Sequence, residues 1–152
     1  MSYTYKYPRP MVTVDILLLR SYRRKMQVLL VQRGEGPYTG QWALPGGFVD
    51  KNESLTSAAY RELQEETNIH NVPLLQLGAF GDPGRDPRGH TVTVVYGGVL
   101  PKRFRGNIVA GDDAAHLNWH KVEKLPKLAF DHETIISQCL RRFQELGILD
   151  KL

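Results

Sequence analysis

Apolar and β-branched residues occur in short runs along this chain, separated by polar or Gly/Pro-rich segments. Residues 10–20 predict a buried strand, and residues 25–33 predict its antiparallel partner. Residues 21–24, between these two strands, are polar and short enough to form a hairpin. Residues 81–90 contain three Gly and two Pro and predict a loop. Three further runs predict strands at residues 73–80, 91–100 and 115–121.

Two segments carry helical periodicity instead. Residues 54–67 predict one helix, and Asp131 is placed to N-cap a last helix that Gly147 follows as the C′ residue. Strands that alternate with two helices predict an α/β fold, a sandwich around a mixed β-sheet. Cys139 falls within the apolar stripe of the last helix, so we expect a packed cysteine and not a nucleophile. That stripe consists of Ile135, Ile136, Cys139, Leu140, Phe143 and Leu146.

Length and cysteine content favour one domain in a reducing compartment. The 152 residues suit a single domain, residues 1–152. The single cysteine excludes a disulfide framework. No apolar run approaches the roughly 18 residues of a membrane span, and residues 1–10 lack the apolar core of a signal peptide. We therefore expect a cytoplasmic protein with no membrane partner.

The charge balance is mildly basic. Lys and Arg number 20 against 16 Asp and Glu, which gives a net charge of +4. The basic residues are scattered, so this surplus is weak support for nucleic-acid binding, and we expect no nucleic-acid partner. A mildly basic domain also attracts small anionic substrates.

The predicted helix at residues 54–67 carries an unusual group of carboxylates. Glu62, Glu65 and Glu66 are spaced i, i+3, i+4 and fall within one arc of about 100°. Leu55 and Ala58 project into the same arc, so the glutamates extend the apolar face instead of opposing it. Three carboxylates placed together repel one another. A bound divalent cation would resolve this conflict.

The donor set indicates which cation. Its ligands are all carboxylate oxygens, which favours Mg²⁺ or Mn²⁺ over Zn²⁺. Mg²⁺ typically takes further oxygens from substrate phosphates. We therefore expect a phosphorylated substrate and attack on phosphorus by a metal-activated water. Pro45, Gly46 and Gly47 precede the helix and predict a tight turn that lets backbone N–H groups approach a phosphate.

These residues resemble the Nudix box, a motif of hydrolases that cleave nucleoside diphosphates linked to another group. Gly47, then Glu53, then the run RELQEETNI at residues 61–69 occur at the spacing of the box. One position departs from it, because Asn68 stands where a glycine is usual. Asn tolerates the left-handed conformation better than most residues, so it can still end the helix.

The resemblance implies a role for each matching residue. The cofactor would be Mg²⁺ or Mn²⁺, and the backbone carbonyl of Gly47 would be one of its ligands. Arg61 would orient the glutamates, and Glu53 would pair with Arg61 or reach a second metal through water. The implied catalytic residues are Glu53, Arg61, Glu62, Glu65 and Glu66, of which Glu62, Glu65 and Glu66 would bind the metal.

Segments outside the box look like the ADP-ribose pyrophosphatase branch of the family. They are residues 9–15, 84–96, 111–114 and 128–132. The likeness covers nearly the whole chain and implies one Nudix-type α/β/α sandwich, which hydrolyses ADP-ribose to AMP and a sugar phosphate. One alternative substrate is an oxidised nucleoside triphosphate or another dinucleotide.

A second alternative is a non-catalytic module that senses ADP-ribose. Regulators of this kind resemble the chain but carry a C-terminal DNA-binding domain, for which a chain ending at Leu152 is expected to leave no room. The complete set of glutamates also favours catalysis, because a sensor does not need it.

Four residues are candidates for substrate binding. Arg85 and Arg88 lie in the Gly/Pro-rich loop and could form a mobile lid over a diphosphate, since arginine matches phosphate with a rigid fork of donors. Solvated surface arginines are the alternative. Tyr38 and Trp42 could stack on adenine, although core packing explains Trp42 equally well.

Three other polar residues remain open. Asp112 and Asp113 could supply a carboxylate near the metal or a catalytic base, or form a turn before a strand. His132 is expected to be structural unless it faces the pocket.

The N-terminal arm, residues 1–10, contains alternating tyrosines. Tyr3, Tyr5 and Tyr7 have a period of two, which predicts an edge strand. A partner subunit in a homodimer could cover the three rings, or the arm could pack on its own domain.

Overall fold

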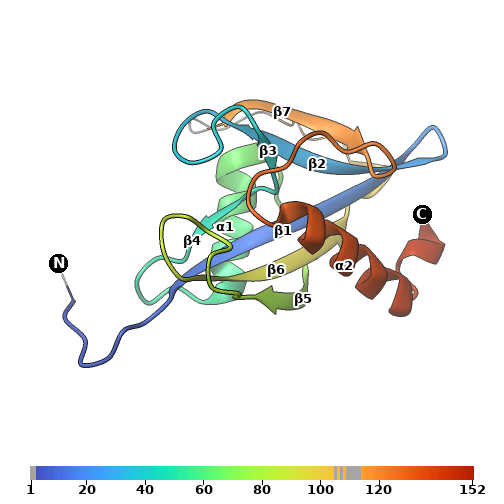
Figure 1. The fold of residues 1–152 in the computed structure, drawn as a ribbon. Coiled ribbons are helices and arrows are strands. Elements are labelled where there is room, and N and C mark those ends of the chain that lie inside the picture. Colours follow the sequence, from blue (N-terminus) through green and yellow to red (C-terminus); the bar gives the residue numbers. More distant parts are fainter. Residues whose placement is uncertain (1–2, 105, 107, 109–113) are drawn as a thin grey trace.

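A computed structural model describes residues 3–104, 106, 108 and 114–152. One mixed β-sheet forms the middle of the molecule, and two helices lie on its opposite faces (Figure 1). These helices are α1 (Leu55–Thr67) and α2 (His132–Glu145), and a 3₁₀ turn, Leu149–Lys151, follows α2. The expected α/β/α sandwich is therefore confirmed.

Within the described residues the sheet has seven strands, and its main order is β3-β2-β1-β6-β5. Strand β4 also pairs with β1, and β7 also pairs with β2. β1 and β6 are parallel, whereas the other strand pairs are antiparallel. The strands are β1 (Met11–Tyr22), β2 (Lys25–Arg33), β3 (Trp42–Ala43), β4 (Gly46–Phe48), β5 (Leu75–Phe80), β6 (Thr91–Val99) and β7 (Ala114–Lys121).

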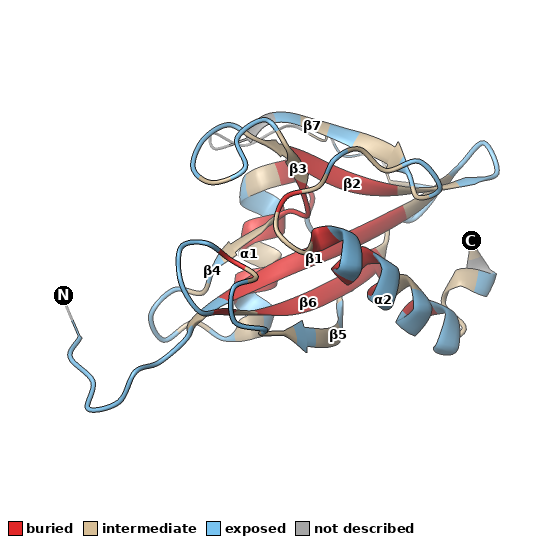
Figure 2. Cartoon of the chain, viewed as in Figure 1, coloured by how far each residue is buried: buried red, intermediate tan, exposed pale blue. Residues whose placement is uncertain are grey.

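The central strand β1 is buried on both faces, as its continuous red segment in Figure 2 shows. Successive side chains of a strand point to opposite faces. Ile16 and Leu18 accordingly join the core cluster that includes Ala58 of α1. Leu17 and Leu19 join the cluster under α2, where Cys139 is also buried. The prediction that Cys139 is a core residue is confirmed, and burial raises the pKa of its thiol to about 11.

The C-terminal ends of both long helices agree with the prediction. The Ser54 side chain accepts a hydrogen bond from the Ser57 backbone and N-caps α1. Asn68 ends α1 in the left-handed conformation, with φ of 61°, which fits the departure from the usual glycine. Gly147 has a φ of 70° directly after the C-cap of α2. Asp131 occupies the N-cap position of α2 but makes no side-chain capping bond.

Two local predictions are wrong. Residues 45–47 form more than a turn, because Gly46 and Gly47 belong to β4 and pair with Asp15 and Val14 of β1. Residues 3–10 contain no strand. Pro8 and Pro10 lack the N–H donors that a strand ladder needs, and the backbone pairing starts only at Met11.

The N-terminal arm extends away from the sheet (Figure 1). Tyr3, Tyr5 and Tyr7 are 49%, 48% and 69% exposed. Tyr3 and Tyr5 stack on each other with 6.2 Å between ring centroids. The arm therefore leaves its tyrosines largely uncovered by its own domain.

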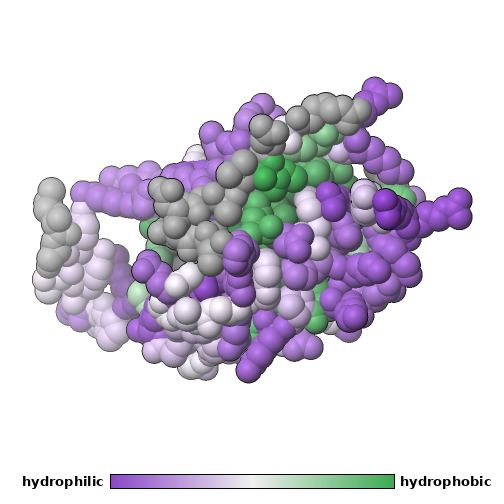
Figure 3. Space-filling view, turned by 90° about the horizontal axis from the view of Figure 1, so that it is seen from above, coloured by the Kyte–Doolittle hydropathy of each residue, from purple (hydrophilic) through white to green (hydrophobic). Residues whose placement is uncertain are grey.

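Polar residues dominate the face drawn in Figure 3, where apolar residues reach the surface mainly near its centre. Among the described residues, no helix combines the length and the apolarity needed to cross a bilayer.

Candidate active site

The site is built where β4 passes close to α1. A Cβ atom on Gly47 would lie 2.5–2.7 Å from the carboxylate of Glu62, so no other residue fits there without displacing that carboxylate. The backbone N–H of Gly46 donates a hydrogen bond of 3.1 Å to Oε2 of Glu66. The two glycines thus bring the backbone of β4 against two of the predicted metal-binding glutamates.

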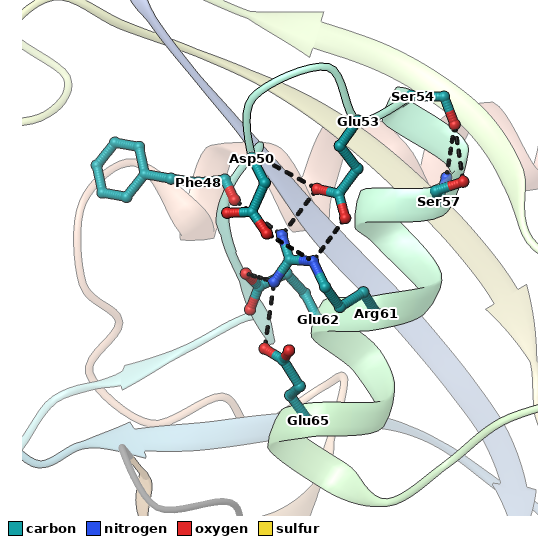
Figure 4. A network of polar contacts seen from close by, with 8 residues as sticks. All are labelled: Phe48, Asp50, Glu53, Ser54, Ser57, Arg61, Glu62 and Glu65. Atoms are coloured by element: carbon teal, nitrogen blue, oxygen red, sulfur yellow. Dashed lines mark hydrogen bonds and ion pairs between the residues drawn. The ribbon is translucent and has the colours of Figure 1, made fainter. Parts of the chain in front are cut away.

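Arg61 joins Glu53, Glu62 and Glu65 into one network of hydrogen bonds (Figure 4). Its Nε and Nη2 bind the two carboxylate oxygens of Glu53 at 2.6 and 2.9 Å. Its Nη1 binds Glu62 at 2.7 Å and Glu65 at 3.2 Å. Nη2 also donates to the Phe48 carbonyl at 3.0 Å, which ties α1 to β4. Arg61 therefore orients three carboxylates, as the resemblance implies.

Arg61 and burial shift the pKa values of Glu53 and Glu62 in opposite directions. Hydrogen bonds from Arg61 lower the pKa of Glu53 to about 2. Burial raises the pKa of Glu62, although Arg61 partly opposes this effect. Glu53 is thus held ionised, whereas charge on Glu62 is costly in the structure as it stands.

The three predicted metal-binding glutamates differ in exposure. Glu62 is buried, Glu66 is half-buried, and the side chain of Glu65 is 59% exposed. Within the described residues, no three acidic, histidine or cysteine side chains converge on one point as a ready metal site. The oxygen donors and the missing Cβ at Gly47 nevertheless fit a hard divalent cation beside Glu62.

A cavity of about 110 Å³ lies beside Glu66 and the two glycines of β4. Its lining combines three arginines with three carboxylates, one histidine and two phenylalanines. The charged and aromatic residues of this lining are Asp15, Arg33, Phe48, Glu66, Arg85, Asp86, Arg88, Phe130 and His132. The arginines of this lining can bind an anionic group next to the predicted metal ligands.

A larger hollow, of about 1210 Å³, lies between β5 and α2. No residue of α1 or β4 lines it. We place the site at the smaller cavity because, of these two, that cavity adjoins the clustered glutamates.

The two loop arginines, both in the cavity lining, have different environments. Arg85 binds both carboxylate oxygens of Asp131, at 2.7 and 2.9 Å, and its side chain is only 5% exposed. Arg88 pairs with the buried Asp86 and is 37% exposed. The alternative of solvated arginines is wrong for Arg85, which is buried and paired with Asp131, whereas the lid over a diphosphate stays a prediction.

Tyr38 and Trp42, the two residues predicted to stack on adenine, also have different environments. Trp42 packs edge-on against His120, with 4.5 Å between centroids, and contacts the core under α2. It is not among the residues that line the cavity. Tyr38 packs on Phe130, with 4.9 Å between centroids, and is 38% exposed. Tyr38 thus lies next to a cavity residue, whereas Trp42 packs as the core alternative expects.

The sequence analysis does not identify several residues that line the cavity. Phe48 and Phe130 both lie near the Arg88 guanidinium, with centroid distances of 4.9 and 5.5 Å. Phe130 has a φ of 52°, which is unusual for a bulky residue and marks local strain. Asp15 gives a signal that could be found, since it is a carboxylate inside an otherwise apolar strand.

His132 is both buried and part of the cavity lining, so the condition for a role beyond structure is met. Its Nδ1 accepts a hydrogen bond of 3.0 Å from the Leu44 backbone. Asp112 and Asp113 lie outside the described residues, and their suggested roles stay predictions.

Known proteins resemble this chain along most of its length. The family model "NUDIX domain" matches residues 9–143. An ADP-ribose pyrophosphatase of Methanocaldococcus jannaschii is 38% identical over 89% of this chain and 76% of its own length. The ADPR-responsive transcriptional repressor NtrR of Acinetobacter baylyi is 37% identical over 90% of this chain, which spans 55% of that repressor.

Solved structures share the fold. A MutT/nudix family protein from Enterococcus faecalis has a TM-score of 0.85 at 33% identity, covering 95% of this chain and 66% of its own. The NUDIX domain of Shewanella oneidensis NrtR, crystallised with ADP-ribose, has a TM-score of 0.79 at 35% identity, with 93% and 94% covered. A bifunctional NMN adenylyltransferase/ADP-ribose pyrophosphatase from Francisella tularensis, with AMP and a Mn ion, has a TM-score of 0.77 at 31% identity, with 90% and 43% covered.

Proposed function

The chain belongs to the Nudix family, and from this premise we propose that it hydrolyses the diphosphate linkage of ADP-ribose or a close relative. The observation that carries the proposal is the contact of Gly47 with the buried Glu62, next to a cavity lined by Arg33, Arg85 and Arg88. An oxygen from water joins one phosphorus while the bridging P–O bond breaks. The products are AMP and a sugar phosphate.

We propose Mg²⁺ or Mn²⁺ as the cofactor, held by Glu62, Glu65, Glu66 and the Gly47 carbonyl. When bound, such a cation lowers the pKa of water and neutralises charge on the diphosphate. Arg61 keeps the carboxylates of Glu62 and Glu65 in place through its hydrogen bonds. The Mn ion in the Francisella relative supports this choice.

The chain's own cations would bind the diphosphate. Arg88 lines the cavity and is more exposed than Arg85, so its guanidinium is the more accessible of the two. Arg33 lies over Phe130, 4.9 Å from its centroid, on the same cavity. Guanidinium groups match phosphate oxygens with two parallel donors.

The substrate class rests on the relatives. Two of them are named ADP-ribose pyrophosphatases, and a third was crystallised with ADP-ribose. An oxidised nucleoside triphosphate is the competing substrate, and a putative 8-oxo-dGTP diphosphatase of Bacillus subtilis is 32% identical over 66% of the chain.

The exposed tyrosines of the N-terminal arm support a homodimer. The single cysteine supports a cytoplasmic location.

A panel of substrates tests the proposal. We expect kcat/KM for ADP-ribose to exceed that for ATP and for 8-oxo-dGTP at least about tenfold, which needs only about 1.4 kcal/mol of differential binding in the transition state. A triphosphate preferred by that margin would contradict the substrate while leaving the family unchanged.

Sensing without catalysis is the second candidate, because two of the relatives are ADP-ribose-binding regulators or their Nudix domains. The buried Glu62 and the Arg61 network favour catalysis, since binding alone does not need them. Turnover of bound ADP-ribose distinguishes the two candidates.

A further inference from the structure

Asp15 is a buried carboxylate that the proposed chemistry leaves without a role. It lies in the middle of β1, is only 7% exposed, and lines the cavity. The glycine opposite makes room for it, because a Cβ atom on Gly46 would lie 2.5 Å from its Oδ1. Thr93 donates a hydrogen bond of 2.5 Å to its Oδ2, which fixes the carboxylate.

His132 faces Asp15 from the first residue of α2. The Leu44 N–H donates to its Nδ1, so a neutral imidazole carries its hydrogen on Nε2. Burial lowers the pKa of His132 and keeps the ring neutral, although Asp15 and Asp131 oppose that shift. The cavity therefore has one fixed donor, Nε2–H, beside one fixed acceptor, Asp15 Oδ1.

The distance between these two atoms is 3.8 Å, which is too long for a hydrogen bond. Both residues line the cavity, so a group placed between them can bind each one. That group has to accept from Nε2–H and donate to Oδ1. A phosphate oxygen cannot donate, and the carboxylate would repel it, whereas Arg33 and Arg88 on the same cavity suit phosphate.

We propose that Asp15 and His132 form a recognition pair that reads a neutral donor–acceptor group of the substrate. This inference rests on the proposed function and adds a specificity determinant to it. ADP-ribose carries such a group in two places. Its terminal ribose has hydroxyls, each of which donates and accepts. Its adenine presents the acceptor N1 beside the donor amino group on one edge.

Two analogues separate these sources. The first lacks the 2- and 3-hydroxyls of the terminal ribose. The second replaces adenine by hypoxanthine, which presents a donor at N1 and an acceptor at position 6, the reverse of adenine. We expect one of them to bind the wild-type protein at least about tenfold more weakly than ADP-ribose, the loss typical of one hydrogen bond. Calorimetry in chelator measures this without turnover.

Asp15→Asn tests whether the pair causes that loss. The Asn oxygen can accept from Thr93, which leaves the amide NH₂ toward the cavity, so the acceptor becomes a donor. If the pair reads the base, we expect the penalty for the hypoxanthine analogue to fall below about threefold, because adenine and hypoxanthine then each match one of the two donors and oppose the other. His132→Asn keeps an acceptor for the Leu44 N–H but removes the Nε2 donor, and is expected to reduce the same penalty.

Asp82→Asn is the matched control, because Asp82 is an exposed loop carboxyl outside this cavity; it should keep the full penalty. Thermal unfolding checks that the variants fold. A wild-type protein that binds both analogues as well as ADP-ribose overturns the inference, as does a penalty that survives both folded variants, since the pair then holds only water. ADP-ribose binding without AMP release would refute the proposed function while this comparison still decides the inference.

Discussion

At the scale of single residues, the site depends on where each carboxylate finds its partners. Glu62 is buried beside a glycine and shares Arg61 with Glu65, whereas Glu66 binds the backbone of β4. Burial opposes the charge of Glu62. A carboxyl group whose pKa is shifted by burial next to a charged partner is typical of a functional site.

Replacing two of the predicted metal-binding glutamates tests their role. Glu62→Gln and Glu66→Gln keep the side-chain size and remove a charge. We expect each to reduce kcat at least about a hundredfold, or about 2.7 kcal/mol. Unfolding temperatures in chelator should stay close to wild type, because the amide oxygen introduced at position 62 can still accept from Arg61. Glu123→Gln, at an exposed carboxyl paired with Lys25, should leave kcat unchanged. Near-normal kcat in both site variants would refute the metal role.

Glu53 gives a prediction on acid stability. Its pKa is lowered from 4.5 to about 2 by Arg61, so its ionised form stabilises the fold above pH 4.5. This contribution is lost as the pH falls from about 4.5 toward 2. Glu53→Gln should therefore unfold at a lower temperature than wild type at pH 7, and the gap should shrink over that window. A gap that is constant with pH would contradict the ion pair.

At the scale of elements, β4 and the loop at residues 81–90 position the site. β4 pairs with β1 and carries the glycines that meet α1, while Arg85 anchors the loop to Asp131 at the start of α2. This anchor also explains why Asp131 does not cap the helix with its side chain, since both of its oxygens bind Arg85.

The loop anchor predicts an effect on stability. Arg85→Ala leaves Asp131 without its partner, and we expect a loss of about 3 kcal/mol of unfolding free energy. In a double-mutant cycle with Asp131→Ala, the two losses should add to more than the loss in the double variant. The exposed pair Arg142–Glu145 is the control, where Arg142→Ala should cost under about 1 kcal/mol. Strictly additive losses at 85 and 131 would contradict the anchor.

The sequence predicts long elements well and short ones poorly. Both helices and the strands from β1 to β7 that exceed five residues follow from periodicity and capping residues, as Asn68 and Gly147 illustrate. β3 and β4 contain only two and three residues, too few for a period. The Glu53–Arg61 pair could be expected from the motif. The cavity role of Phe130 could not, because it depends on contacts between distant segments.

At the scale of the whole molecule, two features face outward. The cavity opens beside α1 and β4, and the N-terminal arm carries three exposed tyrosines away from its own domain. Exposed aromatic rings that stay uncovered are typical of surfaces that contact a partner.

The proposed homodimer gives a test of the arm. Replacing Tyr3, Tyr5 and Tyr7 together by Ser should shift the protein from dimer to monomer in sedimentation, with an unchanged circular dichroism spectrum. Tyr22→Ser, at a similarly exposed ring in the β1–β2 hairpin, should stay dimeric. A wild-type monomer, or a dimer that survives the triple change, would show that the arm does not form the contact.

The central claim is catalysis, and AMP formation tests it most directly. Purified protein is mixed with an excess of ADP-ribose and Mg²⁺ or Mn²⁺, and AMP is counted against protein. We expect many AMP molecules per protein, none in excess chelator, and recovery when the metal is restored. Tight binding of ADP-ribose with no AMP in either metal would contradict catalysis and identify the chain as a sensor.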